Sequence, residues 1–371
     1  MTKPSLAVVA NGMKFKNPFV LGSGPPGTNG KVISRAFERG WGGCVAKTIS
    51  LDSSKVINVA PRYGKHRSRE NGEVIGFENI ELISDRPFET WLDEFKQVKK
   101  QHPDHMLIAS IMEEYDRKAW QTIVKAVQDT GVDGFELNLS CPHGLPERRM
   151  GAAMGQSPEI TREVVGWVKE VSKIPVWAKM TPNVTDITLP ARAAVESGAD
   201  GIAAINTILS VISVDLENMR PAPNVLGHTV PGGYSGQAVR PIALRQVMEV
   251  ARCFRDRPDV SISGIGGIET ATDALQFMAL GATTTQICTG AMLLGFEMVD
   301  GLIADMEKWM SDRSYSSPSE FIGKALDAFT THAHLTELQR EAKIARAGER
   351  GRDNDWNADK IKEQTAALTT N

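Results

Sequence analysis

Cysteine is scarce in this chain of 371 residues. The four cysteines are Cys44, Cys141, Cys253 and Cys288, and no two of them form a CxxC pair. This spacing indicates neither a disulfide framework nor a zinc or iron–sulfur site. A reduced, cytoplasmic protein is the expectation, with Cys44, Cys253 and Cys288 as core residues.

Other features are also missing. No uninterrupted apolar run approaches the ~20 residues that cross a bilayer, and the first residues contain no long apolar segment with a cleavage signal. The net charge of −3 gives no electrostatic reason to expect nucleic acid or an anionic membrane as a partner. No glycine fingerprint for FAD or NAD follows a first strand. We therefore expect neither nucleic acid nor membrane as a partner.

What is present is a polar cluster directly after an apolar segment. Asn138, Ser140, Cys141 and His143 fall within six positions where the apolar run 134–139 ends. Pro142 stops a strand because it lacks a backbone donor. The combination of an amide, a hydroxyl, a thiol and an imidazole at the end of a strand indicates a reactive site.

The chain has a regular rhythm of short apolar segments, each followed by a segment of helical length. We expect strands at 18–21, 43–46, 106–111, 134–138, 176–179, 201–205, 260–263 and 284–287. We expect helices at 31–39, 88–101, 117–130, 158–172, 187–197, 241–253, 270–280 and 296–310, the last of which should be the final regular helix. Ser157 is a plausible helix cap, with Pro158 in the first turn.

Eight strand–helix units predict a closed (β/α)8 barrel of the α/β class. Asn11-Gly12 predicts a hairpin in front of it. The barrel should occupy residues 1–310, and residues 311–371 should form a helical, charged extension. Segment 51–87 is too long for a plain connection and should fold over the barrel mouth. A long loop rich in Gly and Pro is expected to reach Gly236.

Three glycine-rich segments follow the last strands, at 232–236, 264–267 and 289–290. Barrels commonly bind phosphate in the loops after strands seven and eight, where exposed backbone N–H groups form an anion cradle. Lys47 and Lys179 end the second and fifth strands. A lysine in the mouth could form a Schiff base, donate to a reduced flavin, or extend to the rim.

In combination and order, several motifs resemble the FMN-binding barrel of dihydropyrimidine dehydrogenases, in the dihydroorotate dehydrogenase superfamily. The resemblance covers roughly residues 6–310 and rests on Asn138-Leu139-Ser140-Cys141-Pro142-His143-Gly144, Lys179-Met180-Thr181-Pro182-Asn183, Asn206-Thr207, Gly233-Tyr234-Ser235-Gly236, Arg240-Pro241-Ile242-Ala243 and Gly266-Gly267-Ile268. The Cys-Pro-His-Gly order and Glu78-Asn79-Ile80-Glu81 favour the dihydropyrimidine branch.

The resemblance implies roles for individual residues. FMN would be bound by Ser23, Lys47, Thr48, Lys179, Gly236, Gly266, Gly267, Thr289 and Gly290. The pyrimidine ring would be bound by Asn79, Glu81, Asn138, Asn206 and Thr207. Cys141 would be the general acid/base opposite the hydride transferred at flavin N5, with His143 and Ser140 tuning or relaying its proton.

The family's barrels usually carry, or are fused to, a module that binds two 4Fe–4S clusters. No cysteine follows Cys288, so cysteines of this chain cannot hold those clusters. Electrons between NAD(P)H and FMN would then come through a separate electron-transfer subunit, a soluble donor or direct encounter. A homo-oligomer is also expected.

The main reading is interconversion of uracil or thymine with 5,6-dihydropyrimidines, in pyrimidine catabolism. The alternatives are oxidation of dihydroorotate, a related cyclic amide as substrate, a Schiff-base lyase using Lys47 or Lys179, and a non-catalytic barrel that docks a redox partner.

Overall fold

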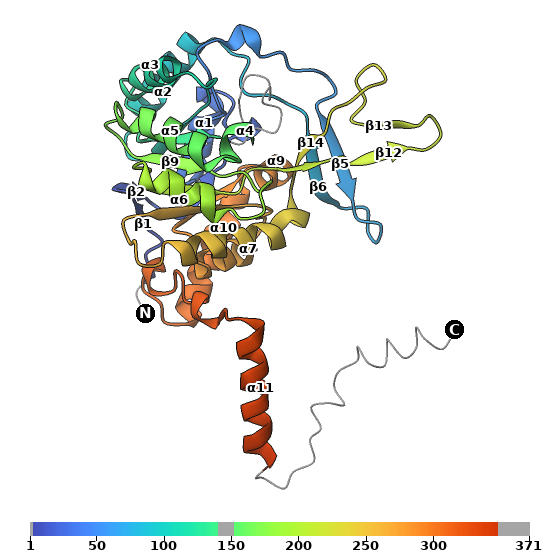
Figure 1. Ribbon diagram of the computed structural model, residues 1–371. Helices are drawn as coiled ribbons and strands as arrows, with labels where there is room; N and C mark the ends of the chain where they lie inside the picture. Colours follow the sequence, from blue (N-terminus) through green and yellow to red (C-terminus); the bar gives the residue numbers. More distant parts are fainter. Residues whose placement is uncertain (1–2, 140–151, 348–371) are drawn as a thin grey trace. The chain divides into compact units, whose positions relative to one another are not determined.

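The fold is a closed barrel of eight parallel strands, as predicted (Figure 1). The computed structural model describes residues 3–139 and 152–347. Around the barrel the strands follow the order β3, β4, β7, β8, β9, β10, β15, β16, and β16 pairs with β3. Their bounds are β3 Phe19–Leu21, β4 Gly43–Val45, β7 Met106–Ile111, β8 Gly134–Asn138, β9 Val176–Lys179, β10 Gly201–Ala204, β15 Ser261–Ile265 and β16 Thr284–Ile287.

Helices surround the barrel because each presents an apolar stripe to the strands. Their bounds are α1 Gly30–Arg39, α2 Phe88–Gln101, α3 Arg117–Gln128, α5 Pro158–Lys169, α6 Thr188–Glu196, α7 Arg240–Cys253, α8 Ala271–Ala279 and α10 Met298–Asp312. The shorter helices are α4 Ala152–Gly155, α9 Thr289–Leu294 and the 3-10 turns η1 Pro25–Gly27, η2 Ser53–Lys55, η4 Gln237–Val239, η5 Pro318–Glu320 and η6 Leu326–Ala328. The expected cap is confirmed, because the Ser157 side chain accepts the N–H of Ile160.

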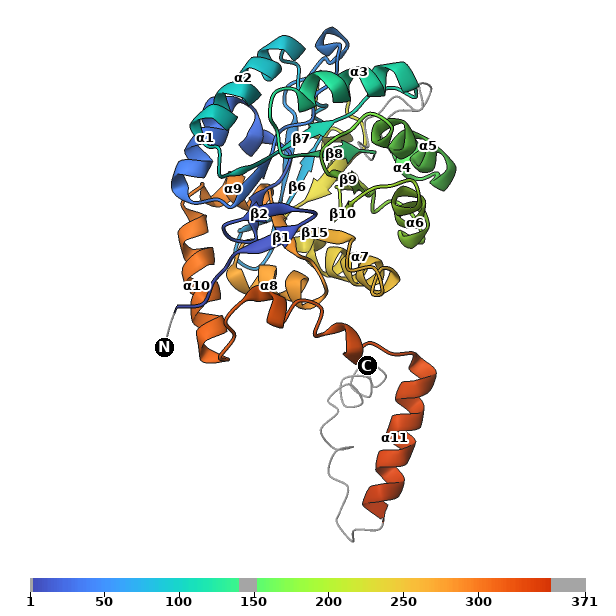
Figure 2. The same ribbon diagram turned by 90° about the vertical axis from the view of Figure 1, so that its left-hand side faces the viewer.

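The predicted hairpin consists of β1 (Val8–Ala10) and β2 (Met13–Phe15) and lies across the end of the barrel where the strands begin (Figure 2). Asn11 ties it there by donating to the backbone oxygen of Asp200 at 2.5 Å and accepting the Trp177 indole N–H at 2.8 Å. The opposite end, where the strands finish, stays available for a site.

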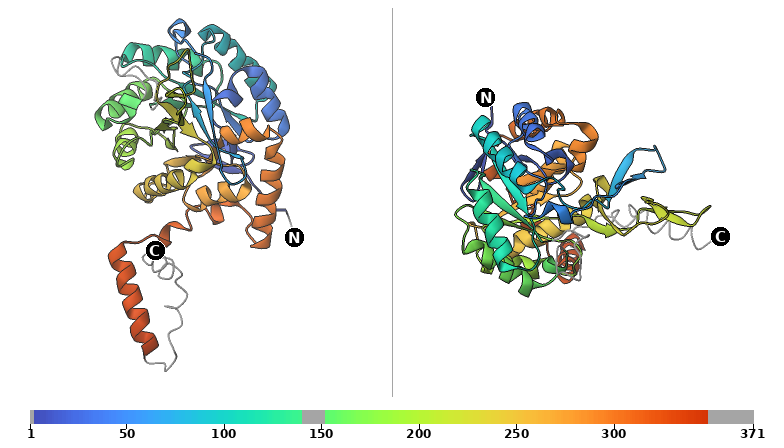
Figure 3. Two further views of the ribbon diagram at one scale, coloured as in Figure 1. Left: turned by 90° about the vertical axis from the view of Figure 1, so that its right-hand side faces the viewer. Right: turned by 90° about the horizontal axis from the view of Figure 1, so that it is seen from above.

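The expectation of a long loop up to Gly236 is wrong, because strands lie in that segment. Strands also lie in the insert 51–87. An antiparallel sheet has the order β11 (Ile208–Ser210), β14 (Gly232–Ser235), β6 (Val74–Asn79), β5 (Tyr63–Arg67), and β12 (Ser213–Asp215) pairs with β13 (Arg220–Ala222). These strands project to one side of the barrel (Figures 1 and 3). The buried Glu78 carboxylate stabilises the sheet by accepting from Ser210 Oγ at 2.8 Å and from the Gly232 N–H at 3.3 Å.

The chain divides into two compact units, Met1–Leu326 and Asp327–Asn371. The second unit contains α11 (His332–Ala347), so the expectation that the helix predicted at 296–310 is the last regular helix is wrong. Within the described ranges, no helix has the length and apolarity needed to cross a membrane.

Candidate active site

A pocket opens where the barrel strands end, and the residues that line it come from many strands. It encloses about 1180 Å³ including its open mouth. All predicted cofactor and substrate residues line it: Ser23, Lys47, Thr48, Asn79, Glu81, Asn138, Lys179, Asn206, Thr207, Gly236, Gly266, Gly267, Thr289 and Gly290. The predicted catalytic residues Ser140, Cys141 and His143 lie outside the described residues.

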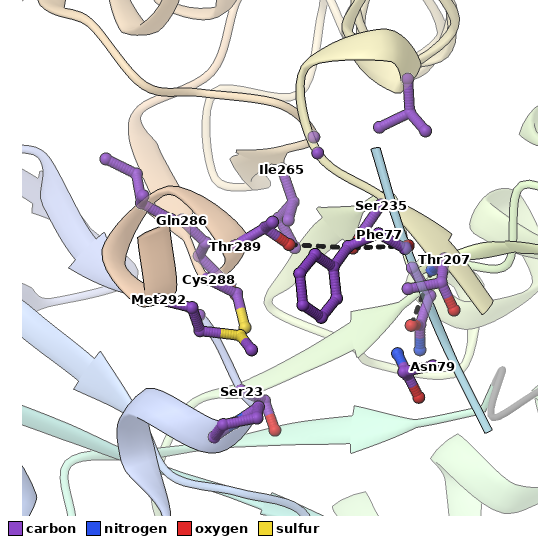
Figure 4. A pocket seen from close by; sticks show the side chains of 18 of the residues that line it. Ser23, Phe77, Asn79, Thr207, Ser235, Ile265, Gln286, Cys288, Thr289 and Met292 are labelled. Atoms are coloured by element: carbon purple, nitrogen blue, oxygen red, sulfur yellow. Dashed lines mark hydrogen bonds between the residues drawn. The ribbon is translucent and has the colours of Figure 1, made fainter. Parts of the chain in front are cut away.

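One side of the pocket is formed by backbone with few side chains. Gly236 and Gly267 have φ of 96° and 68°, a region that favours glycine. A Cβ on Gly267 would approach the carbonyl oxygen of Gly236 to 2.6 Å, so the two loops pack backbone against backbone. Beside them the hydroxyls of Ser235 and Thr289 are 2.8 Å apart (Figure 4). Exposed backbone and hydroxyl donors of this kind suit an anionic group such as phosphate.

A buried charged group lies deeper, at the ends of the barrel strands. Lys179 Nζ is 3.0 Å from Oε1 of Glu136, and neither side chain is more than 7% exposed. Gln286 Nε2, from β16, donates to Glu136 Oε2 at 2.7 Å across the barrel. Gln286 Oε1 is buried without a hydrogen-bond partner among the residues that the structure describes. The lining of the pocket therefore includes Lys179, paired with a buried carboxylate, and Gln286, whose side-chain oxygen has no partner among the described residues.

A continuous series of hydrogen bonds joins the polar residues of the mouth. The Ser23 and Thr48 hydroxyls are 3.3 Å apart, and Thr48 Oγ1 accepts from Asn138 Nδ2 at 3.0 Å. Asn138 Oδ1 accepts from Asn206 Nδ2 at 3.1 Å, and Asn206 Oδ1 accepts the N–H of Thr207 at 2.8 Å. Because these bonds fix which end of each amide carries the oxygen, they orient the donors and acceptors of the mouth.

An ion-pair cluster forms a further part of the lining. Glu81 Oε2 accepts from Lys47 Nζ at 2.8 Å and from the Tyr63 hydroxyl at 2.9 Å. Burial alone would raise the pKa of Glu81, but the charge of Lys47 and the hydrogen bonds outweigh burial and hold that pKa below its ordinary value. Burial and the charge of Glu81 raise the pKa of Tyr63. Glu81 therefore stays ionised, and Tyr63 remains a neutral donor.

Sequence reasoning missed several lining residues. Tyr63 and Phe77 come from the inserted sheet, and Met292 comes from α9. The interpretation of Cys288 as a core residue is wrong, because it is partly exposed and lines the pocket (Figure 4). Burial raises the pKa of Cys288 to about 11. Its position directly after a barrel strand was a usable signal.

Glu113, just beyond β7, gives a pH-dependent prediction. Its buried carboxylate accepts the Leu51 N–H at 2.6 Å, and burial raises its pKa from 4.5 to about 7. Between these values the folded chain holds a proton that the unfolded chain has released, so the free energy of unfolding falls as pH rises through this window. Glu113→Gln, which keeps the acceptor, should stabilise the protein by about 2–3 kcal/mol near pH 8.

Urea unfolding of both proteins at several pH values measures this effect. The gain in stability should vanish below pH 4.5, where the Glu113 carboxyl of the wild type is protonated in both the folded and the unfolded chain. Glu114→Gln, at the neighbouring and more exposed carboxyl, is the matched control and should show no comparable gain. An equal gain at all pH values would contradict the assignment.

Comparison with known proteins decides the family. Residues 5–310 match the family described as dihydroorotate dehydrogenase. The chain belongs to this family. The chain is 52% identical over 379 residues to "Dihydropyrimidine dehydrogenase (NADP(+)), chloroplastic" of Arabidopsis thaliana, and the match covers 100% of this chain and 89% of the relative.

Two further relatives are informative. "NAD-dependent dihydropyrimidine dehydrogenase subunit PreA" of Escherichia coli (strain K12) is 41% identical over 88% of this chain and 78% of its own length. "Dihydroorotate dehydrogenase B (NAD(+)), catalytic subunit" of Pyrococcus abyssi is 37% identical over 85% of this chain and 97% of its own length. The predicted resemblance and the oxidoreductase class are confirmed.

Proposed function

We propose that the chain is an FMN-dependent oxidoreductase that interconverts uracil or thymine with their 5,6-dihydro forms. The observation that carries this proposal is that one pocket combines glycine loops and hydroxyls suited to phosphate with an oriented set of amides suited to a pyrimidine. The similarity to proteins named dihydropyrimidine dehydrogenase supports the same substrate class.

The residues present fit FMN. Gly236, Gly266, Gly267, Thr289 and Gly290 would hold its phosphate, on the side of the pocket that is mostly backbone. Ser23, Lys47, Thr48 and Lys179 would surround the ring and ribityl chain, and the orphaned Gln286 Oε1 leaves an acceptor for a ring N–H. When bound, FMN supplies hydride chemistry at its N5.

The substrate ring has two carbonyls and two N–H groups, so it needs a matched set of acceptors and donors. Asn79, Asn138 and Asn206 supply amides, which provide both, with Thr207 and Glu81 beside them. The hydrogen bonds between Thr48, Asn138 and Asn206 fix the amide orientations before substrate arrives. A preformed set of this kind lowers the entropic cost of binding.

The proton would come from Cys141. A thiol with a reference pKa of about 8.5 is largely protonated at neutral pH and can give a proton to C5 of the pyrimidine. In the oxidising direction the thiolate removes that proton. Ser140 and His143 would tune or relay it; the support for these three roles is the sequence motif.

Electrons from NAD(P)H would reach the pocket through a separate subunit, as the name of the PreA relative suggests. Among the residues that the structure describes, no group of three or more His, Cys, Asp or Glu side chains is arranged to hold a metal ion. We propose that the chain acts as a homo-oligomer in the cytoplasm, with this partner subunit.

Anaerobic mixing of the purified flavoprotein with dihydrouracil and, separately, with dihydroorotate tests the proposal. Dihydrouracil should bleach the flavin absorption and dihydroorotate should do so poorly. A colourless protein that does not take up added FMN would overturn the cofactor assignment. Faster bleaching by dihydroorotate would overturn the substrate assignment.

Thr48→Val should raise the KM for dihydrouracil about 3- to 10-fold, the effect of one hydrogen bond. The Thr48 hydroxyl accepts from Asn138 and lies 2.8 Å from the hydroxyl of Ser110, and valine keeps its shape without the oxygen. Steady-state kinetics measure the KM, and the FMN content is measured beside it because Thr48 is also among the residues proposed to surround the cofactor. Thr48→Ser should restore the KM, whereas failure to do so would show that packing is responsible.

A further inference from the structure

A carboxylate with two cations around it contributes to the lining of the pocket. Glu81 follows β6 and its side chain is 9% exposed. Besides Lys47 and Tyr63, its second oxygen, Oε1, accepts from Arg62 Nη1 at 2.6 Å. Lys47, Tyr63 and Glu81 line the pocket, and Arg62 lies on the more exposed side, with 36% of its side chain accessible.

Each cation of this cluster is already paired. Among the residues that the structure describes, Glu81 is the carboxylate within ion-pair distance of Lys47, whose side chain is 8% exposed. A buried cation without a partner is strongly unfavourable, so Lys47 depends on Glu81. Arg62 is likewise held by Glu81, so neither cation is free to pair with a second carboxylate.

This arrangement distinguishes between pyrimidines by charge. An uncharged ring such as uracil needs only hydrogen bonds, which the amides and the Glu81 cluster can provide. A ring that carries a carboxylate, such as orotate, needs a free cation, and it would meet an ionised glutamate and cations that this glutamate already holds.

We propose that Glu81, held by Lys47, Arg62 and Tyr63, is the specificity determinant that makes the pocket select uncharged pyrimidine rings over ring carboxylates. The inference rests on the proposed function and adds the residues that set substrate charge. It also predicts the reverse: without the Glu81 charge, Lys47 is left as a buried cation that an anionic ring can neutralise.

Glu81→Gln is the test, because it keeps the shape and removes the charge. Dissociation constants for uracil and orotate are measured on the FMN-loaded protein by calorimetry, which does not require turnover. The wild type should bind uracil at least 10-fold more tightly than orotate. Glu81→Gln should bind orotate at least 10-fold more tightly than the wild type does.

Two variants keep the test decisive. Lys47→Met in the Glu81→Gln background should abolish the gain in orotate affinity, because the cation is gone. Arg62→Gln alone, at a partly exposed position, should leave the preference for uracil unchanged or increase it. This variant provides the test if Glu81→Gln does not fold.

The outcomes separate the two proposals. If the wild type binds uracil and is reduced by dihydrouracil, but Glu81→Gln gains no orotate affinity, the specificity inference is overturned and the proposed function stands. If Glu81→Gln does not fold, a loss of uracil preference in Arg62→Gln overturns the inference. If the wild type binds orotate as tightly as uracil, or binds neither, the inference fails together with its premise.

Discussion

Replacing Cys141 by alanine is expected to lower turnover of dihydropyrimidines about 10²- to 10⁴-fold, the usual contribution of a positioned general acid or base. FMN content should stay unchanged, because the residues proposed to hold its phosphate and ring come from other strands. Anaerobic stopped-flow measurement of flavin reduction at saturating dihydrouracil reports the step, and the absorption spectrum reports the bound cofactor.

The chain offers a matched control at a second thiol. Cys288 lines the pocket, but burial raises its pKa to about 11, which makes it a poor proton donor. Cys288→Ser should therefore retain most of the activity. Full activity in Cys141→Ala, or a loss confined to Cys288→Ser, would show that the proton comes from elsewhere.

Lys179→Met is expected to destabilise the protein by about 3–5 kcal/mol, the usual effect of breaking a buried ion pair. It leaves the Glu136 carboxylate, which is fully buried, with the hydrogen bond from Gln286 but without its cation. Urea unfolding of the wild type and the variant measures the loss of stability.

The double variant Lys179→Met with Glu136→Gln separates stability from function. It removes the stranded charge, so most of the lost free energy of unfolding should return. Flavin reduction should be impaired in both the single and the double variant, since both lack the Lys179 cation. A double variant no more stable than the single one would contradict the assignment of the loss to the unpaired carboxylate.

The barrel could be predicted from the sequence because its signals are local. Buried strands such as 106–111 and 176–179 are short apolar runs, and each is followed by an amphipathic helix with its own cap or glycine stop. The inserted sheet was not predicted as strands. Its strands are largely half-buried or exposed, and three of them contain glycine in place of a clear alternation, as Gly232-Gly233 in β14 shows.

Which residues lie at the ends of the strands follows from the local sequence pattern, and the parallel barrel necessarily brings those ends to one rim. That is why Asn138, Lys179 and Asn206 could be assigned to one site without coordinates.

The partners of those residues could not be predicted from the sequence and are known from the folded chain. Glu136 and Gln286 meet across the barrel from strands 150 positions apart, and Arg62 reaches Glu81 within the segment 51–87, for which no strands were predicted. Ion pairs and hydrogen bonds depend on distances in the folded chain, and neither hydrophobic periodicity nor motif spacing contains those distances.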